Sequence, residues 1–329
     1  MPKVVPHKKI ESEVSVVTQK PYGSKLGKKI WFNGELKDSE TVNVHITAHS
    51  LHYGLAAFEG IRCYQLTDGK LGIFRCEDHM LRFVQSCHTG ILPLKYTLAE
   101  LVEGCRVTVK EAGLGACYLR PIGFLDAGPL GVYFNPESHP FSVAILAMDW
   151  GKYLGDEAMK RGSRLKISSF TRHHPNIAMT KAKFTGNYIN GVLAKSEARS
   201  MGFDEALMLD PEGYIAEGTG ENIFLVSRGK VFTPSVETVL AGITRDTVGH
   251  ILADMKLPIV ERRMTRDELY NADEVFLTGT AAEITPVAEV DLRKIGSGKP
   301  GPVTQEVQRR FFDIVTGVDS QYKKWITEV

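Results

Sequence analysis

Two Asx-Gly dipeptides between strand-like segments constrain the fold of the first part of this chain more than any other feature. Asn33-Gly34 separates IWF from ELK, and Asp68-Gly69 separates CYQLT from KLGIF. Such dipeptides favour the two-residue turn of an antiparallel hairpin, because they tolerate the positive φ that this turn requires. Residues 97–100 (TLAE) form a capping box before an amphipathic segment that Gly113 is placed to end. Hairpins that alternate with helices favour an α+β fold over a doubly wound parallel sheet.

The second half of the chain also alternates between helices and strands. A length of 329 residues suggests two domains. We place the boundary in the segment around 150–163, which is rich in glycine and charge. We expect helices at 186–200 and 244–255, and strands at 118–125, 142–148, 205–209, 223–226, 230–232, 258–262 and 274–278.

The overall composition is that of an ordinary globular protein. Forty basic residues against thirty-nine acidic ones leave a net charge of +1, which offers no electrostatic case for binding nucleic acid or an anionic membrane. The longest apolar runs, such as 142–148, are strand-sized. The N-terminal segment is basic but lacks the apolar core of a signal peptide. The five cysteines form no CxxC pair, so we expect buried free thiols and a cytoplasmic protein.

Several common catalytic patterns are absent from the sequence. His45, His49 and His52 have spacings of four and three, but no acidic general base accompanies them and no HExxH motif occurs. We therefore expect structural histidines and no metal site. The sequence also contains neither the G-x-S-x-G turn of serine hydrolases nor the G-x-x-x-x-G-K-[ST] loop of nucleoside triphosphatases.

Three features of the second half suit one cofactor. The stretch KAKFTGNYING contains Lys181 and Lys183, and a lysine is chemically useful where its amine is desolvated and uncharged. Thr244 opens a helix, and residues 279–282 (GTAA) follow an apolar strand, so both places offer free N–H groups to an anion. Glu217 lies among small residues, where a buried glutamate needs a cationic partner. A helix cap, a tight turn and solvated charges explain each feature alone. Together, an amine, two anion-binding loops and a carboxylate are what pyridoxal phosphate requires.

The sequence resembles the class IV, or D-amino-acid-aminotransferase-like, pyridoxal-phosphate enzymes, and most closely the bacterial branched-chain amino acid aminotransferases. The resemblance runs from about Ile30 to the C-terminus and is carried by motifs in the family's order, SLHYGLAAFEGIRCY, YLRPIGF, DWGKYLG, KAKFTGNYING, GYIAEGTGENIF, LAGITRD and VFLTGTAAEITPV. It implies a small α+β domain and a larger β-barrel-like domain with the cofactor between them. The expected segments are an N-terminal extension (1–29), the small domain (30–150), an interdomain linker (151–161) and the large pyridoxal-phosphate-binding domain (162–329).

The resemblance also assigns cofactor roles to individual residues. In the family, the lysine that forms the Schiff base lies five residues before a tyrosine that hydrogen-bonds the phenolic oxygen of the cofactor. By this spacing Tyr188 identifies Lys183 as the nucleophile and leaves Lys181 a structural role. Glu217 would be the partner of the pyridine nitrogen. The other expected cofactor contacts are Leu240 against the ring and, at the phosphate, Arg82, Thr244, Thr280 and the backbone of Ile243.

The expected substrate contacts follow from the same resemblance. Arg120 would receive the distal carboxylate of glutamate, and Tyr118 with the backbone of residues 280–281 would bind the α-carboxylate. The apolar walls would be formed by Tyr53, Phe58, Trp150 and Tyr153, and Thr280 and Ala281 would line the pocket. Leu130 and Val132 should reach the pocket of a partner subunit, which implies a homodimer at least.

The resemblance implies reversible ping-pong transfer of an amino group between L-leucine, L-isoleucine or L-valine and 2-oxoglutarate, in branched-chain amino acid biosynthesis. The alternatives with the same fold are a D-amino acid or (R)-amine aminotransferase and an aminodeoxychorismate lyase; Arg120 within YLRP argues against them. An alternative from another class is a phosphate-binding protein in which Lys183 is inert. Two features depart from the family's pattern: the loop 126–132 (DAGPLGV), and the bulky Phe184 in place of a small residue.

Overall fold

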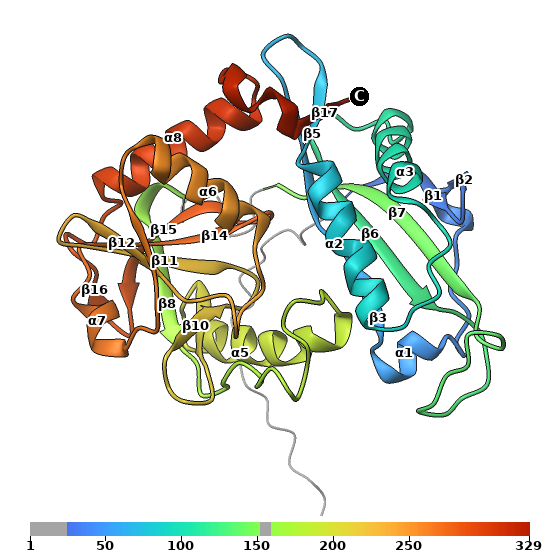
Figure 1. The fold of residues 1–329 in the computed structure, drawn as a ribbon, viewed down its shortest axis with the longest axis horizontal. Helices are drawn as coiled ribbons and strands as arrows, with labels where there is room; N and C mark the ends of the chain where they lie inside the picture. The colour runs from blue at the N-terminus through green and yellow to red at the C-terminus, as the bar shows by residue number, and fades with distance from the viewer. Residues whose placement is uncertain (1–24, 152–158) are drawn as a thin grey trace, which may run out of the picture.

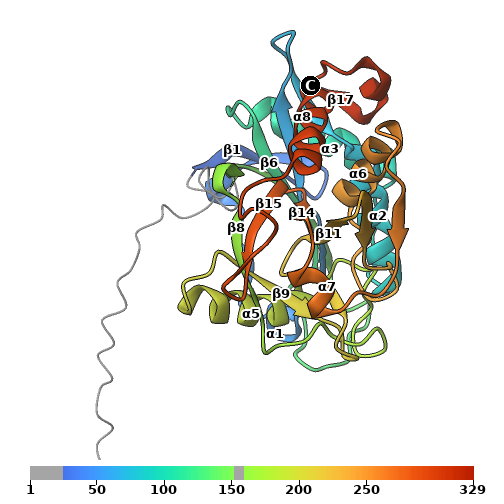
Figure 2. The same ribbon diagram turned by 90° about the vertical axis from the view of Figure 1, so that its left-hand side faces the viewer.

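Two β-sheets, each covered by helices, form the two halves of the molecule (Figure 1). The computed structural model describes residues 25–151 and 159–329. The first half of the chain builds the sheet at the right of Figure 1, and the second half builds the sheet at the left. After a quarter turn, α8 (Pro302–Val315) lies at the end of the molecule opposite α1 (His49–Tyr53) (Figure 2).

The first sheet is antiparallel in all of its strand pairs. Its order is β17-β5-β4-β6-β7-β1-β2, and β3 pairs with β6. The strands are β1 (Lys25–Phe32), β2 (Glu35–Asp38), β3 (Ala56–Phe58), β4 (Ile61–Gln65), β5 (Leu71–Phe74), β6 (Cys117–Leu125), β7 (Phe141–Asp149) and β17 (Ile326–Glu328).

Both predicted hairpins are present, and one of them has a longer loop than predicted. Asn33-Gly34 joins β1 to β2 as a two-residue turn, with φ of 51° and 94°. The loop between β4 and β5 spans residues 66–70. Its Asp68 carboxylate accepts a hydrogen bond from the Lys70 N–H at 3.0 Å, which closes a wider turn than the dipeptide alone would make.

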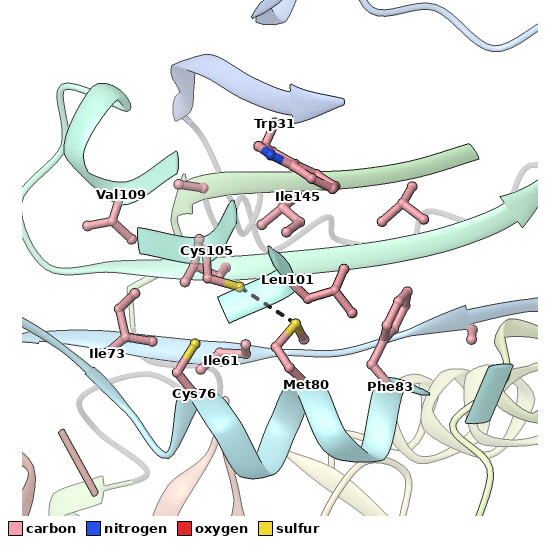
Figure 3. Close-up of a cluster of buried hydrophobic side chains, with 14 of the residues drawn as sticks. Trp31, Ile61, Ile73, Cys76, Met80, Phe83, Leu101, Cys105, Val109 and Ile145 are labelled. Carbon is pink, nitrogen blue, oxygen red and sulfur yellow. Dashed lines mark hydrogen bonds between the residues drawn. The ribbon is translucent and has the colours of Figure 1, made fainter. Parts of the chain in front are cut away.

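Two helices cover one face of the first sheet and complete its core. The helical elements of this half are η1 (Ser39–Thr41), α1 (His49–Tyr53), α2 (Cys76–Thr89) and α3 (Leu98–Glu111). The predicted capping box is confirmed: the Thr97 hydroxyl accepts from the Glu100 N–H, and the Glu100 carboxylate accepts from the Thr97 N–H. Side chains from α2, α3 and the sheet interdigitate beneath Trp31 (Figure 3). All five cysteines are buried free thiols, as predicted.

The second sheet is mixed and has the order β10-β9-β8-β15-β14-β11-β12-β13, with β16 paired to β15. Its strands are β8 (Ser163–Ile167), β9 (Glu205–Leu209), β10 (Ile215–Gly218), β11 (Asn222–Ser227), β12 (Lys230–Thr233), β13 (Ile259–Glu261), β14 (Glu274–Gly279), β15 (Glu283–Val290) and β16 (Arg293–Lys294). The helical elements of this half are η2 (Thr185–Asn187), α5 (Tyr188–Ser200), α6 (Ile243–Asp254), α7 (Arg266–Tyr270), α8 (Pro302–Val315) and η3 (Ser320–Trp325).

The central strands of the second sheet are buried on both faces. On β14, Val275 and Leu277 join one apolar cluster, while Phe276 joins the cluster beneath α6 and α8. On β11, Phe224 stacks on Phe276 at 5.1 Å. Successive side chains of a strand point to opposite faces, so a strand between two cores is apolar along its whole length.

The predicted elements of the chain correspond well to the observed ones. Each of the seven strands predicted from residue 118 onward agrees with an observed strand to within one residue at each end, and the two predicted helices of the second half correspond to α5 and α6. The strands β3, β8, β10, β15, β16 and β17 and the helices α7 and α8 were not predicted. Within the described ranges, no helix is both long enough and apolar enough to cross a membrane.

The two ends of the chain depart from a division by sequence order. The last strand, β17, returns to the first sheet and pairs with β5, with Ile326 opposite Phe74 (Figure 1). At the other end, β1 begins at Lys25, within the predicted N-terminal extension. Most of the predicted linker, residues 152–158, lies outside the described residues. The domain ranges therefore stay a prediction.

Candidate active site

The backbone of Lys183 is fixed to the first half of the molecule. The Phe58 N–H donates to the Lys183 carbonyl at 3.0 Å, and the Lys183 N–H donates to the Ser86 hydroxyl at 3.0 Å. Phe184, which the sequence analysis singled out as a departure, is 5% exposed and packs in the core of the first sheet. Its aromatic ring thus anchors the chain next to Lys183, and this contact accounts for a bulky residue at that position.

The amine of Lys183 lies in the wall shared by two adjoining cavities. Its Nζ is 2.5 Å from the Tyr188 Oη and 4.8 Å from the centre of the Phe58 ring. Tyr188 is the first residue of α5, and its ring meets that of Phe58 edge-on at 5.0 Å. Lys181 lines neither cavity, and its Nζ donates to the Val239 carbonyl at 3.0 Å.

The first cavity contains Glu217 and its partners. Glu217 is 6% exposed, and its carboxylate accepts hydrogen bonds from Arg172 Nε at 2.5 Å, Asn222 Nδ2 at 3.2 Å and the Leu240 N–H at 3.3 Å. Burial raises the pKa of Glu217, and the charge of Arg172 opposes that rise. A buried glutamate needs a cationic partner, and Arg172 is that partner of Glu217 in the structure.

One end of the first cavity is built to receive an anion. Gly242 is the N-cap of α6, and Ile243 and Thr244 are its first two residues. The N–H groups of this first turn have no partners within the helix. Thr278 lies near the end of β14 and Thr280 follows the strand, and the buried Thr278 hydroxyl has no hydrogen-bond partner among the described residues. Arg82 lines the same cavity. The structure thus brings together the predicted contacts Arg82, Ile243, Thr244, Thr280 and Leu240.

The second cavity has a volume of about 400 Å³ and is walled by aromatic rings. Tyr118 stacks on Trp150 at 4.7 Å. The guanidinium of Arg120 lies 4.9 Å from the Phe58 ring centre and 5.6 Å from that of Tyr118. The buried Arg120 Nε has no hydrogen-bond partner among the described residues, so this arginine is available to an anionic ligand. Ala281 and Thr280 also line this cavity.

Three predicted substrate residues lie outside both cavities. Tyr53 is 42% exposed, Leu130 is 54% exposed and Val132 is 85% exposed, and these three line neither cavity. The loop of Leu130 is held to α1, since His49 Nε2 contacts the Gly131 carbonyl at 2.8 Å. Tyr153 lies outside the described residues.

Several residues of the site carried no signal that the sequence analysis used. Arg172 lies 45 positions from Glu217, and nothing in its local sequence marks it. Glu59 and Gly60 follow Phe58 in the FEG of the first motif, and a side chain at Gly60 would collide with the Tyr118 hydroxyl. Asn222 could have been found, because it belongs to the EGTGEN run that contains Glu217.

A second buried carboxyl, Glu221, lies in the walls of both cavities. It is 2% exposed and adjoins Glu205, which pairs with Lys195 and accepts from the Thr219 hydroxyl at 2.8 Å. Burial and the nearby charge of Glu205 raise the pKa of Glu221 to about 8. Burial and the neighbouring carboxylate therefore favour the protonated form of Glu221.

The three histidines weighed as metal ligands do not form a cluster. His49 is buried, whereas His45 and His52 are exposed and bond to nearby groups of the chain. Across residues 25–151 and 159–329, no group of three or more His, Cys, Asp or Glu side chains is placed to hold a metal ion.

Comparison with known proteins identifies the family of this chain. Residues 56–290 match the family described as amino-transferase class IV. A branched-chain-amino-acid aminotransferase of Pseudomonas aeruginosa is 46% identical over 300 residues, which cover 91% of this chain and 97% of that protein. The corresponding enzyme of Escherichia coli K12 is 42% identical over 302 residues, with coverage of 91% and 97%.

Solved structures give the same answer. The branched-chain amino acid aminotransferase of Escherichia coli has a TM-score of 0.88 at 41% identity, covering 91% of this chain and 98% of that one. The enzyme of the thermophilic archaeon Thermoproteus uzoniensis, solved with norvaline, has a TM-score of 0.86 at 40% identity, with coverage of 92% and 99%. The predicted α+β class IV fold is thus confirmed, and the chain belongs to the class IV aminotransferase family.

Proposed function

We propose that this protein is a branched-chain amino acid aminotransferase. It transfers an amino group reversibly between L-leucine, L-isoleucine or L-valine and 2-oxoglutarate, with pyridoxal 5'-phosphate as cofactor. The relatives of Pseudomonas aeruginosa and Escherichia coli carry that name over nearly their whole length. The observation that carries the proposal is the contact of Lys183 Nζ with Tyr188 Oη at 2.5 Å, in the wall between an anion-binding cavity and an aromatic one.

The residues of the first cavity fit pyridoxal phosphate. The buried Thr278 hydroxyl, which lacks a partner among the described residues, and the free N–H groups of α6 suit the phosphate. In the same cavity, the Glu217 carboxylate suits a protonated ring nitrogen. We assign Arg82, Ile243, Thr244 and Thr280 to the phosphate, and Leu240 to the ring.

Lys183 and Tyr188 do the proton chemistry in this proposal. When bound, pyridoxal phosphate withdraws electrons from the Cα of the amino acid and carries the amino group between the two half-reactions. Lys183 is the nucleophile that holds the cofactor, and its freed Nζ then takes the Cα proton as a general base. Tyr188 Oη, at 2.5 Å, keeps that amine oriented.

Glu217 and Arg172 control the protonation of the cofactor's ring nitrogen, which determines how strongly the ring withdraws electrons. An ionised Glu217 keeps a proton on the ring nitrogen, and this requires that its charge be stabilised despite burial. Arg172 Nε, at 2.5 Å from Glu217 Oε1, supplies that stabilisation. Asn222 fixes the second carboxylate oxygen.

The second cavity accounts for two dissimilar substrates. Its aromatic walls, Phe58, Tyr118 and Trp150, suit an aliphatic side chain, and Arg120 suits the distal carboxylate of glutamate. One similar enzyme has been solved both with N-(5'-phosphopyridoxyl)-L-glutamate and with 4-methylvaleric acid, so a protein of this fold accepts both chemistries. Tyr118 and the backbone of residues 280–281 are assigned to the α-carboxylate.

The active unit in this proposal is at least a homodimer in the cytoplasm. Leu130 and Val132 are exposed on one loop and Tyr53 on the neighbouring α1, where they gather apolar surface that a second copy would cover. In the dimer, Leu130 and Val132 would complete the pocket of the partner. Tyr153 is assigned, with Tyr53, Phe58 and Trp150, to the apolar walls of the substrate pocket.

An absorbance spectrum of the purified protein with pyridoxal phosphate tests the proposal. We expect L-leucine to convert the cofactor band, D-alanine to leave it unchanged, and 2-oxoglutarate to restore it. If D-alanine converts the cofactor band and L-leucine does not, the fold assignment would stand, but L-branched-chain amino acids would be excluded as substrates. The Lys183→Ala variant is the control, since a phosphate-binding protein without cofactor chemistry would behave identically with and without that amine.

A further inference from the structure

Glu59 is a buried carboxylate whose two oxygens are both fully engaged. It follows β3 and has no exposed surface. Oε1 accepts from Arg82 Nε at 2.6 Å. Oε2 accepts from Arg82 Nη2 at 2.9 Å, from His79 Nδ1 at 2.7 Å and from the Gly60 N–H at 3.3 Å. A carboxylate that takes both donors of one guanidinium fixes its plane as well as its position.

Arg82 is held from two directions at the anion-binding end of the first cavity. Its Nε and Nη2 meet Glu59, and its Nη1 donates to the Ala241 carbonyl at 2.9 Å, just before the first turn of α6. Its side chain is 12% exposed and lines both cavities. The hydrogen bond to Ala241 therefore joins α2, in the first half of the molecule, to the segment just before α6 in the second half.

The face of α2 that points to the cavity explains how these groups meet. His79, Arg82 and Ser86 have spacings of three and four, so they share one side of the helix. Ser86 holds the backbone of Lys183, while His79 and Arg82 meet Glu59. Burial lowers the pKa of His79, so the imidazole is neutral and its Nδ1–H is the donor to Glu59. The cluster of Glu59, His79 and Arg82 thus carries no net charge.

We infer that Glu59 is a positioning residue that holds the Arg82 guanidinium toward the phosphate of the cofactor, with His79 as its second support. This inference rests on the proposed function, because it takes the anion of the first cavity to be the phosphate of pyridoxal phosphate. Arg82 contacts the phosphate, and Glu59 acts only through Arg82.

Two effects of Glu59 on phosphate binding have opposite signs. Its negative charge opposes an anionic ligand, and so its removal would favour phosphate. Its two parallel hydrogen bonds with Arg82, a fork, keep the guanidinium in place. Removal of Glu59 would therefore let the flexible Arg82 side chain leave the site. A glutamine at this position keeps the shape but offers one acceptor and one N–H₂ donor, so the amide cannot take both donors of Arg82. We expect the loss of the fork to outweigh the loss of the charge.

The test compares pyridoxal phosphate with pyridoxal, which lacks the phosphate. Dissociation constants of both are measured spectroscopically on the full-length apoprotein, for the wild type and for Glu59→Gln. We expect the affinity for pyridoxal phosphate to fall about tenfold or more, as for lost outer partners of metal ligands, and the affinity for pyridoxal to change less than about threefold. In an Arg82→Met background, Glu59→Gln should no longer change the ratio of the two affinities.

Glu274→Gln is the matched control. Glu274 is also a buried glutamate, but its carboxylate accepts from Val303 and Thr304 at the start of α8, and it lines neither cavity. The affinity ratio of this variant should equal that of the wild type. If Glu59→Gln does not fold, His79→Leu removes one support of Glu59 and should lower the ratio by about two- to fivefold.

Each outcome decides the inference. Equal losses for both ligands would mean a purely structural Glu59, and tighter binding of pyridoxal phosphate would mean that the charge dominates; either result overturns the proposal. An unchanged ratio in His79→Leu would overturn it as well. If the wild type binds neither ligand, the proposed function itself fails.

Discussion

Arg82 and Arg120 line the same cavity but are paired in opposite ways. Arg82 has a buried carboxylate and a backbone carbonyl as partners. Arg120 lies among three aromatic rings, and its buried Nε has no partner among the described residues. The Arg82 guanidinium is thus held in place before any ligand binds, whereas the Arg120 guanidinium has no anionic partner until a ligand binds.

The difference suits two kinds of ligand. A cofactor that stays through every turnover is best served by a preorganised group, because the cost of ordering it falls on folding. A pocket that takes a carboxylate in one half-reaction and an aliphatic side chain in the other needs a charge without a fixed partner. Phe58, Tyr118 and Trp150 stabilise that charge through their ring faces without supplying a competing anion.

The largest expected effect comes from removing the carboxylate that holds Arg82 in place. Glu59→Ala removes the carboxylate and leaves Arg82 buried without its partner, which should lower the free energy of unfolding by about 3–5 kcal/mol. Arg120→Met leaves no carboxylate behind, so its loss should stay below about 1 kcal/mol. Denaturant titration of both apoproteins measures the two values. Equal losses would show that the two arginines do not differ in pairing.

The next largest effect concerns Arg120, which has no anionic partner in the absence of a ligand. Arg120→Met should lower kcat/KM for L-glutamate by about 100- to 1000-fold, since two charge-assisted hydrogen bonds to a carboxylate disappear. For L-leucine the loss should be less than about tenfold, because an aliphatic side chain makes no hydrogen bond to the guanidinium. Steady-state kinetics in each half-reaction provide the measurement. A similar loss for both amino acids would contradict the assignment of Arg120 to the distal carboxylate.

Glu221 sharpens the comparison, because this buried carboxyl has the carboxylate of Glu205 as its neighbour instead of an arginine. Burial by itself would raise the pKa of Glu59, but the charge of Arg82 and the hydrogen bonds from Arg82 and His79 outweigh burial and lower that pKa. Burial and Glu205 instead raise the pKa of Glu221 to about 8. A raised pKa in the folded state means that folding favours the proton, so Glu221 destabilises the fold progressively as pH rises from about 4.5 to about 8.

Glu221→Gln should remove that pH dependence. Relative to the wild type, the variant should gain about 3 kcal/mol of stability between pH 5 and pH 8. Thermal unfolding of both proteins across this range measures the difference. A difference that stays constant with pH would mean that Glu221 is ionised throughout.

The smallest effect is a control remote from the cavities. Thr97→Ala removes the cap of α3 and should cost about 1 kcal/mol of unfolding free energy. The affinity ratio for pyridoxal phosphate and pyridoxal, and the preference between glutamate and leucine, should both remain as in the wild type. A change in either would show that general loss of stability alters the two arginines.

Features that depend on neighbours along the chain could be predicted. The capping box of α3, the turn at Asn33-Gly34 and the start of α6 near Thr244 follow from local backbone chemistry. Periodicity located most strands because burial on one or both faces leaves a mark on each strand itself. The loop at Asp68-Gly69 was longer than predicted, since a side-chain bond to Lys70 competed with the two-residue turn.

The sequence by itself determined which groups of the family's chemistry this protein carries, including Lys183 with Tyr188 five positions on and Glu217 shortly before β11. Only the tertiary structure decided which buried charges face one another. Arg82 meets Glu59 across 23 positions, and Arg172 meets Glu217 across 45. Pairing at such separations depends on how the sheets and helices pack, and in a low-dielectric interior that packing determines whether a charge is compensated, protonated or left for a ligand.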